Sequence, residues 1–218
     1  KYVAEYQQQP EQLRAVTGTA STMVLGFSTL LAVVFLLAAK PVSVALFGHA
    51  DYQHVVRIVA FLQMGIAWAN LSLAIMKGFR DAMGNALALI VGSLIGVVAY
   101  YACYKVGGYS GALVGLALVP ALVVVPAALL LAKRDHLPMR YLLPQWHGEL
   151  ACNLGKFTLM ALITSVTLPV AWVMMRNLLA AHYSWEEVGL WQGVTTISDA
   201  YLQFITATFS VWLLPTLS

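Results

Sequence analysis

The stretch ALALIVGSLIGVVAYYACY, residues 86–104, decides the fold class of this chain. It holds no charged side chain and has the length that a helix needs to cross a bilayer, about 20 apolar residues. A second uncharged run, ALVGLALVPALVVVPAALLL at 112–131, follows after the glycine-rich segment 107–111. Two such runs joined by a glycine-rich turn predict a pair of membrane-spanning helices.

The composition extends this prediction to the whole chain of 218 residues. Hydrophobic residues make up 61% and charged residues 10%, whereas soluble domains carry about 25% charged residues. Apolar runs of membrane length recur along the sequence. The six predicted spans are 17–39, 54–76, 86–104, 112–131, 157–179 and 188–214. We therefore predict an all-α, polytopic transmembrane helix bundle.

The basic residues predict the orientation in the membrane, because cytoplasmic loops carry an excess of Lys and Arg. If the N-terminal segment is cytoplasmic, that side holds Lys1, Arg14, Lys77, Arg80, Lys133, Arg134, Arg140 and Lys156, and the opposite side holds Lys40, Arg57, Lys105 and Arg176. The bias places segment 133–155 in the cytoplasm and the turn 107–111 outside. Segment 133–155 is read either as a solvated loop along the headgroups or as a hinge between two helical lobes.

Two GxxxG patterns, Gly92 to Gly96 and Gly111 to Gly115, lie in neighbouring predicted spans. Small residues at this spacing let helix backbones approach closely in lipid. We expect them to pack the helices of this chain together, and a dimer contact is the alternative.

Two rows of polar side chains run along the predicted spans 157–179 and 188–214. Residues three or four apart share a helix face. The first row is Thr158, Ser165, Pro169, Trp172 and Arg176, and the second is Gln192, Thr195, Thr196, Asp199, Gln203, Thr206 and Ser210. A charge in hydrocarbon costs about 2.5–3.5 kcal/mol on insertion scales, so such rows usually face a bundle interior or a wet cavity. They predict the polar interior that a transporter requires.

The charged members of these rows are the first candidates for a binding site. Arg176 lies near the outer end of its span, where it could anchor in the headgroups or hold a phosphate or carboxylate through its planar fork of donors. Asp199 lies near the middle of its span and could meet a structural partner, contact substrate, or couple transport to an ion or proton. Arg57, about one turn into its span, is either an interface anchor or a ligand.

Catalytic and metal-binding motifs are missing from the sequence. There is no Walker A motif, nucleophile elbow or HExxH. Cys103 and Cys152 have no ligand spacing beside them and read as small buried hydrophobes. We predict a transporter, not an enzyme, with no cofactor, no metal and no nucleic-acid partner.

Four long stretches carry a resemblance to a known family. They are MKGFRDAMGNALALIVGSLIGVVAYY (76–101), GGYSGALVGLALVPALVVVPAALLL (107–131), KFTLMALITSVTLPVAWVMMRNLLA (156–180) and SWEEVGLWQGVTTISDAYLQFITATFSVWLLPTLS (184–218). These stretches resemble enterobacterial Wzx-type polysaccharide flippases of the multidrug/oligosaccharidyl-lipid/polysaccharide exporter superfamily. The resemblance runs along the whole chain.

The resemblance implies two bundles of six helices that give alternating access to a central cavity. This chain would supply spans three to eight of twelve, as a piece of a longer protein: residues 1–132 end the first lobe, 133–155 form the cytoplasmic linking loop, and 156–218 begin the second lobe.

The cargo implied by the resemblance is an undecaprenyl-pyrophosphate-linked trisaccharide with an acidic sugar, turned from the cytoplasmic to the periplasmic leaflet of the bacterial inner membrane. Polymerase and chain-length proteins of the same pathway are the expected partners, beside the lipid bilayer. The predicted substrate-binding residues are Arg176, Asp199, Gln203, Gln192, Arg57, Ser165 and Thr158.

Two other functions stay open at this point. A cation-coupled exporter of small molecules or drugs, from the same superfamily, would use Asp199 as its coupling site. A membrane-embedded glycan polymerase or transferase would need large polar outer loops, and the outer loops predicted here are short.

Overall fold

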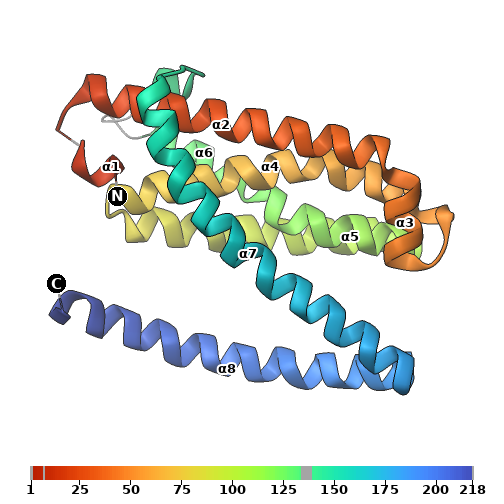
Figure 1. The fold of residues 1–218 in the computed structure, drawn as a ribbon. Helices are drawn as coiled ribbons and strands as arrows, with labels where there is room; N and C mark the ends of the chain where they lie inside the picture. The colour runs from red at the N-terminus through yellow and green to blue at the C-terminus, as the bar shows by residue number, and fades with distance from the viewer. Residues whose placement is uncertain (1, 7, 134–138, 218) are drawn as a thin grey trace. The chain divides into compact units, whose positions relative to one another are not determined.

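The computed structural model describes residues 2–6, 8–133 and 139–217, and within these residues the chain is helical with no strand. The helices are α1 (Tyr2–Glu5), α2 (Pro10–Leu37), α3 (Ala39–Phe47), η1 (Ala50–Tyr52), α4 (Gln53–Gly78), α5 (Ala82–Leu122), α6 (Val124–Ala132), η2 (Met139–Leu142), α7 (Gly148–His182) and α8 (Trp185–Leu217) (Figure 1). The all-α prediction is confirmed. The chain divides into two compact units, Lys1–Gly155 and Lys156–Ser218.

Four helical stretches among the described residues are long and apolar enough to cross a membrane: Pro10–Leu37, Ala50–Gly78, Ala82–Ala132 and Gly148–His182. The third stretch has 51 residues and contains two spans, because Gly108 leaves the helical conformation with φ 54° and ψ −132°. These helices overlap the predicted spans from 17–39 to 157–179, and α8 overlaps the predicted span 188–214. The chain is therefore a multi-pass membrane protein.

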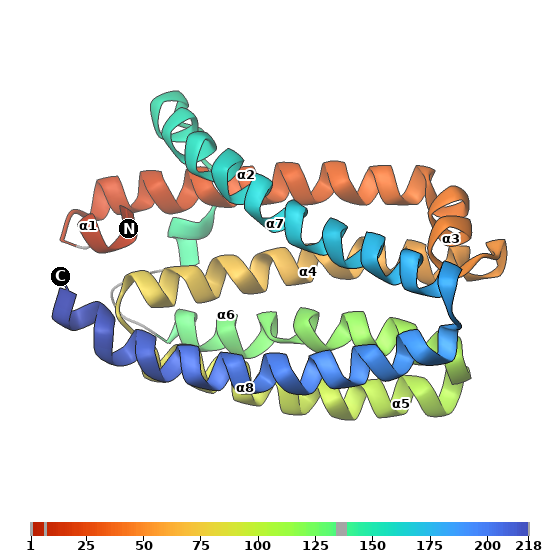
Figure 2. The same ribbon diagram turned by 60° about the horizontal axis from the view of Figure 1, so that its bottom comes forward.

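The two arms of α5 fold back on each other at Gly108 and pack through their glycines (Figures 1 and 2). A Cβ atom on Gly96 would lie 2.8 Å from the Cα of Val119, so no side chain larger than hydrogen fits without a shift. The facing pairs are Gly92–Val123, Gly96–Val119 and Tyr100–Gly115, whose numbers run in opposite directions along the two arms. The prediction that the GxxxG patterns pack helices within this chain is confirmed.

The first unit packs α2, α4, α5 and α6 against one another. Its buried cluster consists of Leu13, Ala69, Leu73, Ile75, Met76, Ala88, Val123, Ala127 and Leu131. Large apolar side chains also cover the outside of the same helices, for example Phe27, Leu94 and Val98, which are 59%, 64% and 72% exposed. This apolar outer surface suits contact with lipid chains, since a water-soluble surface would carry more charge.

One connection differs from the prediction. Helix α3 lies in the connection between the predicted spans 17–39 and 54–76, and Lys40 and Pro41 lie in its first turn. Proline is tolerated there because the first N–H groups of a helix have no acceptor within the helix. The helix ends at Gly48, whose φ of 76° is the left-handed conformation that favours glycine.

Part of the predicted loop or hinge segment 133–155 packs against α2. Residues 141–147, which we call the strap, lie along α2. The Thr17 hydroxyl donates to the carbonyl of Tyr141 (2.9 Å) and the Thr22 hydroxyl to that of Gln145 (2.8 Å). Gly18 leaves room for this contact, since a Cβ there would lie 2.9 Å from the Cβ of Gln145. Helix α7 then begins at Gly148, earlier than the predicted 157.

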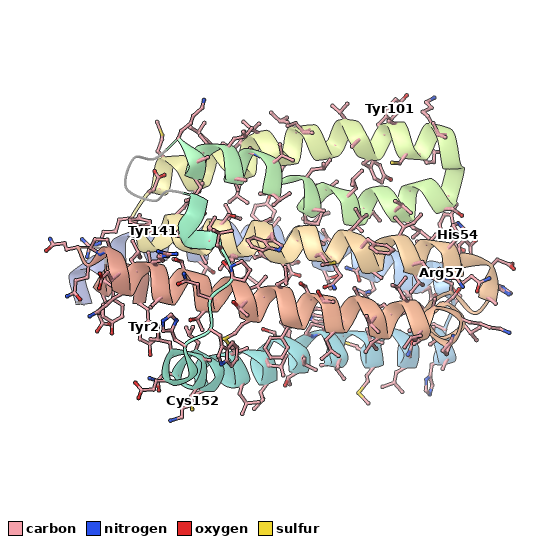
Figure 3. All side chains as sticks on the ribbon, turned by 90° about the horizontal axis from the view of Figure 1, so that it is seen from above. Tyr2, His54, Arg57, Tyr101, Tyr141 and Cys152 are labelled. Atoms are coloured by element: carbon pink, nitrogen blue, oxygen red, sulfur yellow. The ribbon has the colours of Figure 1, made fainter. Side chains whose placement is uncertain are left out.

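The two ends of the first unit carry different groups of labelled side chains (Figure 3). Tyr2, Tyr141 and Cys152 lie at the end that holds the strap, and His54, Arg57 and Tyr101 lie at the opposite end. At that opposite end the ring of Tyr52 contacts those of Phe47 and Tyr109, with centroid distances of 5.0 and 5.7 Å. Clustered aromatic rings at the end of a helix bundle are typical of the membrane–water interface.

Candidate functional site

The candidate site lies in the second unit, which is a helical hairpin. Helix α7 runs to His182, and α8 begins at Trp185 after a turn of two residues. The hydroxyl oxygen of Ser184 accepts a hydrogen bond from the N–H of Glu187 at 3.3 Å, as an N-terminal cap does. Glu186 and Glu187 lie in the first turn of α8, where the helix dipole favours negative charge. Local sequence thus fixes where the hairpin turns.

A pocket of about 310 Å³ lies between the two helices of this hairpin. Its lining consists of Pro169, Trp172, Val173 and Arg176 from α7 and of Gln192, Thr195 and Asp199 from α8. Apart from Val173, these are members of the two polar rows that the sequence shows. The rows therefore face each other across one pocket.

Two polar atoms at the pocket are shielded from solvent and have no hydrogen-bond partner among the described residues: Nε of Arg176 and Oε1 of Gln192. Leaving such an atom unpaired costs about 1–3 kcal/mol. The amide nitrogen of Gln192 is directed to the Thr196 hydroxyl at 3.4 Å, so the amide oxygen is the atom left without a donor. Both residues line the pocket, and each has one polar atom that the described residues leave without a partner.

The hydroxyl groups on α8 are already engaged as donors. Thr195 donates to the backbone carbonyls of Trp191 and Gln192, both at 3.0 Å, and Thr196 donates to the carbonyl of Gln192 at 2.7 Å. Their oxygen atoms keep lone pairs that can accept hydrogen bonds. Toward a ligand, these threonines would act as acceptors.

Arg176 and Asp199 place opposite charges on the pocket from different helices. A guanidinium offers five donors in a planar fork that matches phosphate and carboxylate oxygens. A carboxylate is an acceptor that binds hydroxyl groups, cations or a proton. The arrangement can therefore hold an anionic, hydroxyl-bearing group.

The other predicted site residues lie elsewhere along the chain. Thr158 and Ser165 are exposed on α7 and do not belong to the pocket lining. Gln203 lies in α8 one turn beyond Asp199, and its side chain lies outside the described residues. Arg57 is exposed near the start of α4, in the first unit (Figure 3).

One residue of the site was missed in the sequence. The ring of Trp191 packs against that of Trp172, with centroids 5.4 Å apart and ring planes tilted by 44°. The signal was present, because positions 191, 195 and 199 are spaced by four and share a helix face. The second predicted row begins at Gln192 and therefore does not include Trp191.

The whole chain is similar to known proteins. No protein-family model matches it, and no solved structure matches it. The chain is 71% identical over its 218 residues to the Lipid III flippase of Escherichia coli (strain K12) and to that of Shigella flexneri. Along its full length this chain is similar to lipid III flippases.

The chain spans about half the length of these curated relatives, 52% in each case. The resemblance to flippases that the sequence indicated is confirmed, because the similarity extends over the whole of this chain. The name of these relatives, Lipid III flippase, describes a transporter.

Proposed function

We propose that the protein is a flippase that turns lipid III, an undecaprenyl-pyrophosphate-linked trisaccharide, from the cytoplasmic to the periplasmic leaflet of the bacterial inner membrane, for synthesis of enterobacterial common antigen. The observation that carries this proposal is the 71% identity over the whole chain to proteins named Lipid III flippase. The membrane-length helices and the polar pocket of the α7–α8 hairpin support it.

The physical requirement of the reaction agrees with the pocket. A pyrophosphate and an acidic sugar cannot cross hydrocarbon without partners, because desolvating their charges is costly. In our proposal Arg176 holds an anionic oxygen of the cargo, Gln192 accepts from a sugar hydroxyl, and Asp199 is the counter-charge or coupling acid. The prenyl chain is as apolar as the bilayer and stays in lipid.

The arrangement of the chain in the membrane is part of the same proposal. Residues 1–132 end the first lobe, 133–155 link the lobes in the cytoplasm, and 156–218 begin the second lobe. Polymerase and chain-length proteins of the pathway are proposed as partners, since they would consume the translocated lipid.

The alternative in the same superfamily is a cation-coupled exporter of small molecules, with Asp199 as coupling site. Deleting the gene separates the two functions. If the protein is a flippase, cells without the gene should accumulate lipid-linked trisaccharide, and the complete gene should restore its normal level. Increased drug sensitivity with a normal level of that lipid would contradict the flippase and support the exporter.

A further inference from the structure

We infer that Trp172 is a stacking platform for a sugar ring of the cargo and that Trp191 is the positioning residue behind it. This inference rests on the proposed function, because it names the part of the cargo that the α7–α8 pocket takes. The chemical class of that part is a uronic acid, a pyranose ring bearing a carboxylate.

Trp172 is the large aromatic side chain among the pocket lining residues of the hairpin, and it is half-buried. It lies on the same face of α7 as Arg176, one turn earlier. The face of an indole ring carries negative charge density. The C–H bonds on one side of a pyranose carry partial positive charge, so that side lies flat on an aromatic face.

Trp191 supports this platform from the other helix. Its ring lies 5.4 Å from that of Trp172 at a tilt of 44°, within the range in which aromatic pairs attract. Trp191 is not part of the pocket lining, so it holds Trp172 without competing for the ligand. The hydrogen bond from Thr195 to the carbonyl of Trp191 joins this residue to the next turn of the row.

The polar atoms beside the platform fit a uronic acid. Arg176 and Gln192 both line the pocket: a carboxylate matches the donors of the guanidinium, and a ring hydroxyl can hydrogen-bond to the side-chain amide. A prenyl chain would offer no hydrogen-bonding partner to either side chain. A phosphate would satisfy Arg176 but would make no use of the aromatic face.

The size of the pocket agrees with a single small group. A volume of about 310 Å³ is at the lower end of the range for small-molecule pockets, about 300–1,000 Å³. The pocket therefore takes one part of the cargo, and the remaining sugars and the lipid lie outside it.

The test measures binding of two radiolabelled probes to the purified full-length protein in detergent: glucuronic acid, and propionate as a carboxylate without a sugar ring. Trp172→Leu is expected to weaken binding of glucuronic acid by about tenfold and to leave propionate unchanged. Trp172→Phe keeps an aromatic ring and should lose less affinity for glucuronic acid than Trp172→Leu does. Trp191→Leu should weaken binding of glucuronic acid by about threefold, and Trp191→Phe should bind it as the unaltered protein does.

Two controls complete the design. Trp146→Leu removes an exposed tryptophan of the strap and should change the binding of neither probe. Arg176→Ala should weaken binding of both probes, because both carry a carboxylate.

Three results would overturn the inference: no binding of glucuronic acid to the unaltered protein, unchanged binding by Trp172→Leu, or equal weakening of both probes by that variant. Lipid III transport by the unaltered protein in cells is measured separately. If transport is present while any of these results is obtained, the stacking platform fails and the proposed function stands. If lipid III is not transported, the proposed function fails whatever the probes show.

Discussion

At the scale of single residues, the site is defined by two opposite charges that enter one pocket from two helices. The sequence allowed a structural and a functional interpretation of each of these charged residues. Arg176 and Asp199 line the same pocket, and the planar guanidinium of Arg176 is suited to phosphate and carboxylate oxygens. Substitutions that separate charge from shape therefore test the two residues individually.

Arg176→Ala is expected to lower lipid III transport by about tenfold or more, because a hydrogen bond to a charged group contributes about 1.5–3 kcal/mol. Arg176→Lys keeps the charge but loses the planar fork, so we expect a smaller loss. The measurement is the level of accumulated lipid III in cells that carry each full-length variant as their sole flippase. Equal membrane levels of the variants are the control, and full transport by Arg176→Ala would exclude this residue from the site.

Asp199→Asn and Asp199→Glu separate charge from hydrogen bonding at the second residue. If the negative charge is required, the asparagine variant should transport little lipid III, and the glutamate variant should keep part of the activity. The same accumulation assay reports the result. Near-normal transport by Asp199→Asn would show that the side chain acts only as a hydrogen-bond acceptor.

At the scale of elements, hydropathy predicted the spans because each apolar run has the length of the hydrocarbon core. The GxxxG patterns predicted close helix packing because small residues four positions apart share a helix face and let two backbones approach. The strap could not be predicted, because it depends on Thr17 and Thr22 meeting backbone carbonyls more than 120 positions away, at separations of 124 and 123 residues. Helix α3 was not predicted because hydropathy was read for runs of membrane length, and α3 has 9 residues.

The geometry of α7 and α8 also explains why Thr158 and Ser165 do not line the pocket. Helices α7 and α8 are closest near their turn and diverge from it (Figure 1). Arg176 and Gln192 lie near the turn and meet at the pocket, whereas Thr158 and Ser165 lie farther back along α7. Periodicity predicts which residues share a face, but it does not predict how far along the hairpin two faces stay together.

Packing of the α5 hairpin can be tested by a single methyl group. Gly96→Ala should destabilise the protein by about 1–3 kcal/mol, the usual cost of overpacking, since its Cβ would lie 2.8 Å from the Cα of Val119. Gly26→Ala is the matched control, because nothing lies within 4 Å of a Cβ at that position of α2. Thermal unfolding in detergent measures both, and equal transition temperatures would contradict the packing described here.

At the scale of the whole molecule, the orientation in the membrane follows from the bias of basic residues toward one side. We predict that a cysteine at Ser110 is labelled from outside intact cells, and that a cysteine at His147, an exposed residue of the strap, is labelled only after the cells are made permeable. The reagent is an impermeant maleimide. Labelling of position 147 in intact cells would reverse the proposed orientation.

The central claim is that this protein carries lipid III across the membrane and that the α7–α8 pocket holds its anionic head. The most direct measurement is translocation of purified lipid III in vesicles that contain the full-length protein, followed by a sugar-specific reagent that reaches only the outer leaflet. We predict rapid redistribution of lipid III between leaflets with the unaltered protein and a loss of about tenfold or more in rate with Arg176→Ala. A redistribution rate equal to that of protein-free vesicles would contradict the account.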